Sequence, residues 1–129
     1  MLYVFLLYAD PNTDWPPDVI ERHLAVYREA RARDVYVASE ALGGPSRAKT
    51  VRIRNGRPHT TDGPFAETKE VLGGFYILDC RDLDEALAFA AKIPDAGVGS
   101  VEVRPIVHVP DWPYAENPHR ARHRMTMPE

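Results

Sequence analysis

An uninterrupted apolar run near the beginning of the sequence, from Leu2 to Tyr8, restricts the possible folds more than any other feature. The run contains aromatic and β-branched residues and is followed by the turn-forming pair Asp10-Pro11, so it predicts a β-strand. Because the run does not alternate with polar residues, both faces of this strand must be covered. The helices of the chain itself can cover one face, and in a chain of 129 residues we expect a second copy to cover the other.

Two amphipathic helices and three further strands are expected in the same domain. One helix is predicted over residues 16–33, and another begins at Asp82, with Glu85 three residues later as in a capping box, and closes at Pro94. The further strands are predicted over residues 35–38, 75–78 and 100–109. The expected apolar stripes are Val19, Ile20, Leu24, Tyr27 and Ala30 in the first helix and Leu83, Ala86, Leu87, Ala90 and Ala91 in the second.

The order of these elements, β-α-β-β-α-β, is that of the ferredoxin-like fold, an α+β class with an antiparallel sheet and both helices on one face. The other face needs cover, so we expect two sheets to pack face to face in a homodimer, forming a dimeric α+β barrel. One domain is expected over residues 1–109. An irregular tail is expected over residues 110–129.

A β-hairpin is predicted as an insert between the second and third strands of this arrangement. Its arms are residues 50–54 and 57–60, and the turn is Asn55-Gly56, a pair that tolerates positive φ. Pro58 cannot donate a backbone hydrogen bond, so the returning arm is expected to lie at a sheet edge.

Composition excludes several classes of partner. A formal net charge of -3 gives no basic field for nucleic acid or anionic lipid, and the basic tail cluster at Arg120, Arg122 and Arg124 is offset by nearby carboxylates. The first apolar run is too short to span a bilayer and has no basic residue before it, so a cytoplasmic protein is expected.

Neither a disulfide nor a bound metal or cofactor is expected. The chain has a single cysteine, Cys80, which cannot form an internal disulfide, and its histidines do not have the spacing of metal ligands. No dinucleotide, phosphate-loop or nucleophile-elbow motif occurs, so no cofactor is expected.

A long motif lies between the hairpin and the next strand. The segment Thr61-Asp62-Gly63-Pro64-Phe65 and its continuation to Tyr76 are similar to the signature of DGPF-type proteins within the YCII-related family. The similarity continues through residues 82–87 and 99–105. This resemblance implies a dimeric ferredoxin-like α+β barrel. It implies no single reaction, because the family has scattered members similar to dehydrochlorinases and lactone isomerases, and some members sit beside extracytoplasmic-function sigma factors.

His23 and Asp62 are the candidate catalytic residues. His23 lies on the helix face that is expected to turn toward the sheet, where an imidazole beside a carboxylate suits acid-base chemistry at neutral pH. The stretch His23-Leu24-Ala25 also resembles a family motif whose histidine is a suspected active-site residue. Asp62 is either that carboxylate or a cap of the Asp-Gly-Pro turn, and it meets His23 only if the loop after the hairpin folds over the first helix. Equally, His23 can be a satisfied core histidine.

Further side chains are expected to line the same cavity and to bind the substrate. Arg104 would supply a charge for an anion. The alternative role of Ser39, Glu40 and Arg104 is to form the surface or a dimer contact, and the alternative for Tyr8 is a core aromatic residue with a satisfied hydroxyl. The expected substrate-binding residues are Tyr8, Ser39, Glu40, Phe65 and Arg104.

Two functions follow from these residues. The first is a cofactor-free enzyme that acts on a small cyclic or aromatic metabolite by acid-base elimination or isomerisation, with His23 and Asp62 beside a pocket. The alternative is a non-catalytic regulatory or protein-interaction module in which His23 and Asp62 are apart or are satisfied by backbone groups.

Overall fold

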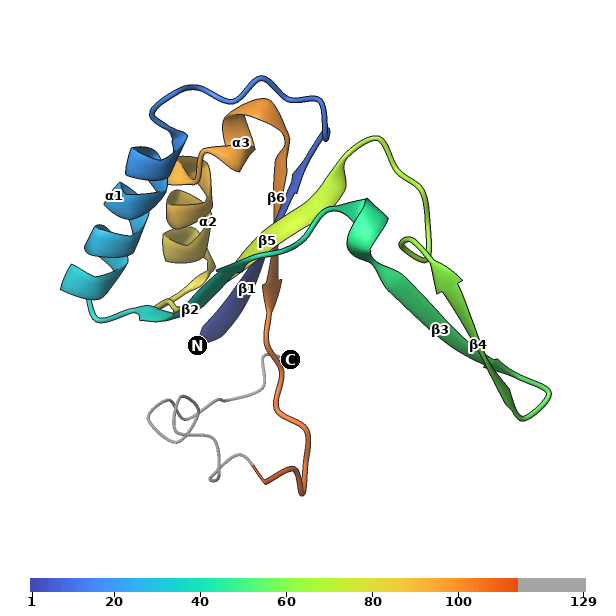
Figure 1. Cartoon of the computed structure of the whole chain (residues 1–129). Coiled ribbons are helices and arrows are strands. Elements are labelled where there is room, and N and C mark those ends of the chain that lie inside the picture. Colours follow the sequence, from blue (N-terminus) through green and yellow to red (C-terminus); the bar gives the residue numbers. More distant parts are fainter. Residues whose placement is uncertain (114–129) are drawn as a thin grey trace.

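A four-stranded antiparallel sheet forms the centre of the molecule, in a computed structural model that describes residues 1–113. Its strands are β1 (Leu2–Ala9), β2 (Tyr36–Ala41), β5 (Val71–Asp79) and β6 (Ser100–Pro105), in the spatial order β2-β5-β1-β6. Every neighbouring pair is antiparallel. This strand order and the two main helices between the strands confirm the predicted ferredoxin-like α+β fold (Figure 1).

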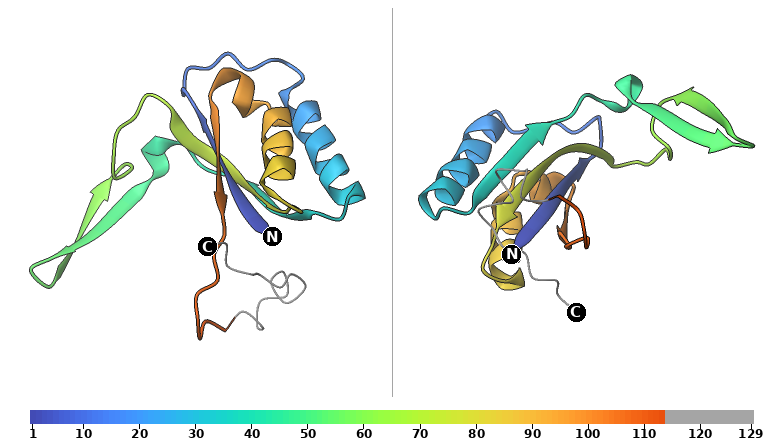
Figure 2. Two further views of the ribbon diagram at one scale, coloured as in Figure 1. Left: turned by 180° about the vertical axis from the view of Figure 1, so that it is seen from behind. Right: turned by 90° about the horizontal axis from the view of Figure 1, so that it is seen from below.

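The helices gather on one side of this sheet (Figures 1 and 2). They are α1 (Val19–Ala32), α2 (Leu83–Lys92) and α3 (Asp95–Val98), and a short 3-10 helix, η1 (Pro45–Arg47), follows β2. The start of α2 matches the predicted capping box in part, because the Asp82 Oδ1 atom accepts a hydrogen bond of 2.9 Å from the Glu85 backbone N–H. The single turn α3 was not expected from the sequence.

The core lies between the helices and one face of the sheet. Tyr3, Phe5 and Leu7 of β1 point toward the helices and are almost inaccessible. Phe5 and Phe89 are the largest fully buried side chains, and burial of each contributes about 2–3 kcal/mol. Side chains of β1 therefore alternate between the two faces of the sheet. The sequence does not show this alternation, because both faces carry apolar residues.

The predicted helix stripes are partly wrong. In α1 the buried residues are Val26 and Ala30, whereas Ile20, Leu24 and Tyr27 are exposed. The apolar residues of α1 span more than one face, and the face that contains Val26 and Ala30 is the one that contacts the sheet. In α2, Ala86 and Ala90 are buried as expected, but Phe89 takes the place predicted for Leu83 and Leu87.

The strand limits also differ from those predicted. β2 continues to Ala41, so Ser39 and Glu40 lie inside the strand rather than after it. β6 ends at Pro105 instead of residue 109, because Pro105 pairs with Tyr3 near the beginning of β1 and little of β1 remains to pair with later residues. The predicted tail over residues 110–129 falls mostly on residues 114–129, which lie outside the described residues, so the division into domain and tail stays a prediction.

The hairpin forms a separate two-stranded sheet that projects from the body of the molecule (Figures 1 and 2). It consists of β3 (Lys49–Arg54) and β4 (Arg57–Asp62), and we call it the arm. Its turn is the predicted one, since Asn55 and Gly56 have φ values of 52° and 74°.

The face of the main sheet opposite the helices is lined by apolar side chains. Val4, Leu6 and Tyr8 of β1 alternate with the core residues, and Phe75 and Ile77 of β5 lie opposite Leu6 and Val4 in the strand register. We call this the open face, because no helix of residues 1–113 lies on it (Figure 2).

Candidate functional site

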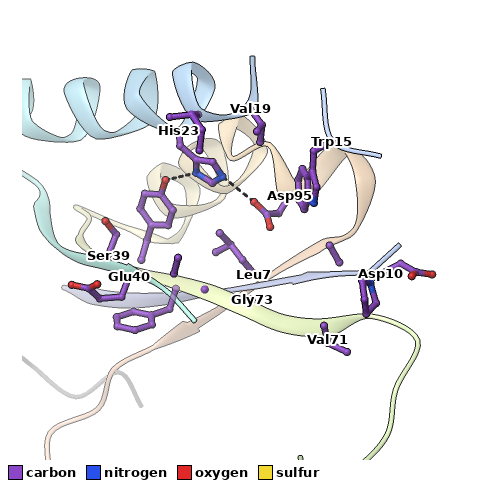
Figure 3. Close-up of a pocket in the computed structure, with 17 residues that line it drawn as sticks. Leu7, Asp10, Trp15, Val19, His23, Ser39, Glu40, Val71, Gly73 and Asp95 are labelled. Atoms are coloured by element: carbon purple, nitrogen blue, oxygen red, sulfur yellow. Dashed lines mark hydrogen bonds and ion pairs between the residues drawn. The ribbon is translucent and has the colours of Figure 1, made fainter. Parts of the chain in front are cut away.

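A pocket of about 570 Å³ opens between the first half of α1, the loop before it and the ends of β1, β2 and β5 (Figure 3). This volume suits a small molecule rather than a polymer. The lining is mostly apolar, and its polar residues are Asp10, His23, Ser39, Glu40, Tyr76 and Asp95. The apolar part consists of Leu7, Ala9, Pro11, Trp15, Val19, Ile20, Ala41, Val71 and Phe75.

His23 lies between two polar side chains in this pocket (Figure 3). Its Nδ1 atom is 2.6 Å from the Tyr76 hydroxyl oxygen, and its Nε2 atom is 3.3 Å from the Asp95 Oδ1 atom. The imidazole also stacks on the Tyr76 ring, with 5.9 Å between ring centres and 15° between their planes. These contacts fix the imidazole on three sides while its side chain stays 28% exposed.

Asp95 is the first residue of α3 and is buried, with 7% of its surface exposed. Its Oδ1 atom faces His23 Nε2 but makes no hydrogen bond of good geometry among the described residues. A buried carboxylate without a full set of partners is costly, and it gains most from a positive charge nearby. Asp95 is therefore suited to stabilise the protonated imidazole of His23.

Tyr76 provides the third polar group. Burial, together with the negative charge of Asp95, raises the pKa of Tyr76 to about 12, so its hydroxyl keeps its proton at neutral pH. The hydroxyl can then donate to His23 Nδ1, which leaves the Nε2 proton directed at Asp95. This tautomer gives the Tyr76 hydroxyl an acceptor and leaves the Nε2 proton on the side of Asp95, whose Oδ1 atom is 3.3 Å away.

The position of Asp95 depends on a close approach between chain segments. The loop that follows α3 passes over the end of β1, and a Cβ atom at Gly99 would lie 2.0 Å from the Tyr8 carbonyl oxygen. Only glycine fits there without moving backbone atoms. Gly99 thus lets α3 lie against β1 with Asp95 beside His23.

Of the predicted substrate-binding residues, Ser39 and Glu40 line the pocket. The Ser39 Oγ atom is 2.7 Å from the Tyr36 hydroxyl oxygen, so a polar group of the β2 wall is already oriented. Glu40 is exposed, and it pairs with Phe75 in the strand register, so both residues belong to the open face. The pocket therefore reaches around the end of the sheet from one face to the other.

Asp62 and Phe65 lie away from the pocket. The predicted pairing of His23 with Asp62 does not occur within the chain, because Asp62 ends strand β4 and its carboxylate binds Lys49 across the arm. Asp62 also does not cap the following turn, although Gly63 has the expected positive φ of 91°. Phe65 follows that turn and is 78% exposed.

Tyr8 and Arg104 belong to the open face, outside the pocket. Tyr8 pairs with Ser100 at the end of β1, while Arg104 pairs with Val4 in the register. The Arg104 guanidinium binds Glu102 at 2.8 Å, and this hydrogen bond raises the pKa of Arg104. The roles predicted for these two residues and for Asp62 and Phe65 stay predictions.

Asp95 and Tyr76 are pocket residues that sequence reasoning missed. The sequence gives a weak indication for Tyr76. It lies two residues before Leu78 in the same strand, so the two side chains are on the same face of the sheet, which is the face toward the helices. For Asp95 the signal was the Pro94-Asp95 pair, which is typical of the first positions of a helix. Asp95 was passed over because the predicted second helix was closed at Pro94.

Residues 1–113 contain no group of three or more histidine, cysteine, aspartate or glutamate side chains that could hold a metal ion. Within the same part of the chain, no helix is long and apolar enough to cross a membrane.

The fold and the pocket define a small ferredoxin-like α+β domain with a polar relay in a helix-side cavity. The chain belongs to the YCII-related domain family, whose model matches residues 1–112. The family expected from the signature segment is thereby confirmed.

Known proteins that resemble the chain include an uncharacterised protein and an enzyme of known structure. An uncharacterised protein of Rhizobium meliloti (strain 1021) is 43% identical over 117 residues, which cover 82% of this chain and 92% of that protein. A solved structure, the 5-chloro-2-hydroxyhydroquinone dehydrochlorinase of Burkholderia phenoliruptrix AC1100 in complex with 2,5-dihydroxybenzoquinone, is 19% identical. It has a TM-score of 0.48 over 84% of this chain and 96% of that chain.

Proposed function

We propose that the protein is a cofactor-independent enzyme that moves a proton on a small cyclic or aromatic metabolite, in an elimination or an isomerisation. The observation that carries this proposal is the contact of His23 with both Asp95 and Tyr76 in a mostly apolar pocket. A pocket with few convergent polar groups is the usual setting of a small-molecule site.

In the proposed mechanism, Tyr76 and His23 act together as the base. The Tyr76 oxygen receives a proton from the substrate as the Tyr76 hydroxyl proton passes to His23 Nδ1, over the 2.6 Å contact between them. The imidazole then carries a positive charge, which the buried carboxylate of Asp95 stabilises. Returning the proton to another substrate atom completes an isomerisation, whereas departure of an anionic group completes an elimination.

The walls of the pocket favour a flat and mostly apolar substrate. Trp15, Val19 and Phe75 offer apolar contact area, while Ser39 offers a hydroxyl for one polar substituent. We therefore propose ring compounds that carry hydroxyl or carbonyl groups as the substrate class, with acidic protons next to the polar substituent.

The test is a screen of such ring compounds for binding, by thermal shift, and for turnover, by absorbance. Asp95→Asn and Tyr76→Phe are expected to lower turnover about 10²–10⁴-fold while the binding of the hit is largely retained. Asp62→Asn is the matched control, since it also neutralises an aspartate but lies on the arm. Turnover that is unchanged in Asp95→Asn and Tyr76→Phe would refute the mechanism.

A second candidate function is ligand binding without reaction. It is favoured by the fact that both ring nitrogens of His23 already have partners, as in a structural histidine. On this alternative a compound would stabilise the protein but remain chemically unchanged after prolonged incubation.

We also propose that the chain forms a homodimer through the open face, where Val4, Leu6, Phe75 and Ile77 gather. Apolar sheet faces of this kind are normally buried against another layer. Sedimentation velocity at micromolar concentration is expected to give the mass of a dimer. Replacing both Leu6 and Ile77 by lysine should give a monomer, and a native chain that is monomeric would refute the proposal. A cytoplasmic location stays a prediction.

A further inference from the structure

The side chains that line the pocket are unbalanced in charge. Asp10, Glu40 and Asp95 are acidic, and His23 is the only basic residue among the lining side chains of residues 1–113, which include no lysine or arginine. A carboxylate or phosphate ligand that leaves water needs cationic side chains to replace its hydration. The pocket is therefore unsuited to an anion and suited to a neutral or positively charged ligand.

The chain segment that borders the pocket adds to this negative charge. Pro11 and Trp15 of this segment line the pocket. Residues 10–21 contain four acidic side chains and no basic one, and the next residue, Arg22, does not line the pocket. A cleft lined by charges of one sign concentrates ligands of the opposite sign. The surroundings of the pocket therefore attract cations.

The negative charge also reaches the interior of the pocket, at Asp95. This residue is more than nine tenths buried, and its Oδ1 atom has no hydrogen-bond partner among the described residues. Its carboxylate points toward His23, into the space between α1 and the sheet (Figure 3). Because burial reduces screening by water, an anionic ligand in this space would be repelled, whereas a cation would lower the cost of burying the carboxylate.

The three carboxylates differ in the partners that they already have. The Asp10 Oδ1 atom accepts a hydrogen bond of 2.9 Å from the Asn12 backbone N–H, and Asp95 faces His23. The Glu40 side chain is exposed and has no hydrogen bond or ion pair within residues 1–113. Glu40 is therefore the carboxylate that is available to a ligand.

Aromatic rings of the pocket favour the same kind of ligand. Glu40 lies directly opposite Phe75 in the strand register, and Trp15 forms another part of the wall. The face of an aromatic ring attracts a cation, so a cation beside both a ring and a carboxylate gains from two interactions. We infer that the pocket binds a ring compound with a protonated amino group, and that Glu40 selects for its positive charge. The inference rests on the proposed function, since this compound would be the substrate of the same pocket.

The test is an amide chemical-shift titration of the whole chain with three compounds that share a phenol ring. Their side chains differ in charge: tyramine is cationic, tyrosol is neutral and para-hydroxyphenylacetate is anionic. Tyramine is expected to bind at least about tenfold more tightly than tyrosol, because an ion pair and an aromatic contact act together, and para-hydroxyphenylacetate should bind most weakly.

Two matched variants test the role of Glu40. Glu40→Gln should reduce the preference for tyramine over tyrosol to less than about threefold. Glu67→Gln is the control and should keep the preference, because Glu67 is also exposed but does not line the pocket. Both substitutions change the net charge of the protein equally, so a difference between them reports a local effect. Glu40→Lys should reverse the order, with para-hydroxyphenylacetate binding more tightly than tyramine.

Equal affinities for the three compounds, a preference for the anion, or no binding of tyramine up to its solubility limit would overturn the inference. A preference for tyramine that is the same in Glu40→Gln as in the native protein would overturn the assignment of Glu40. The readout is binding and does not depend on turnover. Unchanged turnover in Asp95→Asn and Tyr76→Phe would refute the acid-base mechanism and leave the charge preference intact, so the two failures are separately detectable.

Discussion

Removal of the Tyr76 hydroxyl is predicted to change how the stability of the protein depends on pH. The pKa of Tyr76 is about 12 in the folded protein, compared with about 10 for tyrosine in an unfolded chain. The unfolded state therefore releases this proton first as the pH rises. The stabilising contribution of Tyr76 is complete below pH 10 and is lost between pH 10 and pH 12.

The size of this loss follows from the two pKa values. The difference of about two units between the folded and unfolded pKa values corresponds to a stabilising free energy of about 2.7 kcal/mol, of which about 1.4 kcal/mol is lost by pH 11. Phenylalanine at this position cannot titrate, so the Tyr76→Phe variant lacks that loss. The variant also loses the hydrogen bond to His23, which lowers its free energy of unfolding by about 1 kcal/mol at neutral pH.

The assay is urea unfolding of both proteins at intervals from pH 7.5 to pH 11. The native protein should be the more stable by a constant amount, about 1 kcal/mol, up to pH 9. This difference should then fall by about 1.4 kcal/mol by pH 11, so that the variant becomes slightly the more stable there. Burial also raises the pKa values of Tyr3 and Cys80, but these groups are present in both proteins and cancel in the comparison. A difference that stays constant over the whole range would refute the view that Tyr76 is buried and protonated beside Asp95.

Three other substitutions test local features of the fold. Gly99→Ala should destabilise the protein by about 3 kcal/mol in urea unfolding, because its Cβ would collide with the Tyr8 carbonyl, whereas Gly97→Ala meets nothing within 4 Å and should have little effect. Asp82→Ala should cost about 1 kcal/mol in the same assay, as it removes the side-chain cap of α2. Asp62→Asn should change the melting temperature only slightly, since its ion pair is exposed and worth at most about 1 kcal/mol.

Local patterns were sufficient to predict the strands, the two main helices and their order, but not the short helices η1 and α3. Asn55-Gly56 specified the hairpin turn, and Asp82 with Glu85 marked the start of α2, because each signal depends on the backbone of a few adjacent residues. The orientation of a helix about its own axis was less predictable. Apolar residues occur around much of α1, and only contact with the sheet distinguishes Val26 from Leu24.

Of the three residues in the relay, His23, Tyr76 and Asp95, only His23 was a candidate in the sequence, although the predicted Ser39 and Glu40 also line the pocket. His23 was predicted because its spacing from the apolar residues of the same helix can be read directly from the sequence. Its partners come from β5 and from the turn after α2, 53 and 72 positions further along the chain, so no local pattern connects them. The carboxylate was expected at Asp62 because Asp62 lies in a conspicuous motif, whereas Asp95 lies in a turn with no motif of its own.

The displaced motif has a physical consequence. Asp62 binds Lys49 at the base of the arm, and Phe65 follows on the loop that returns the chain to β5, so the start of the motif lies where the arm joins the main sheet. In a single chain the motif and the His23 relay therefore lie apart. The carboxylate beside His23 comes from Asp95 instead, on a turn that only the folded chain brings to the first helix.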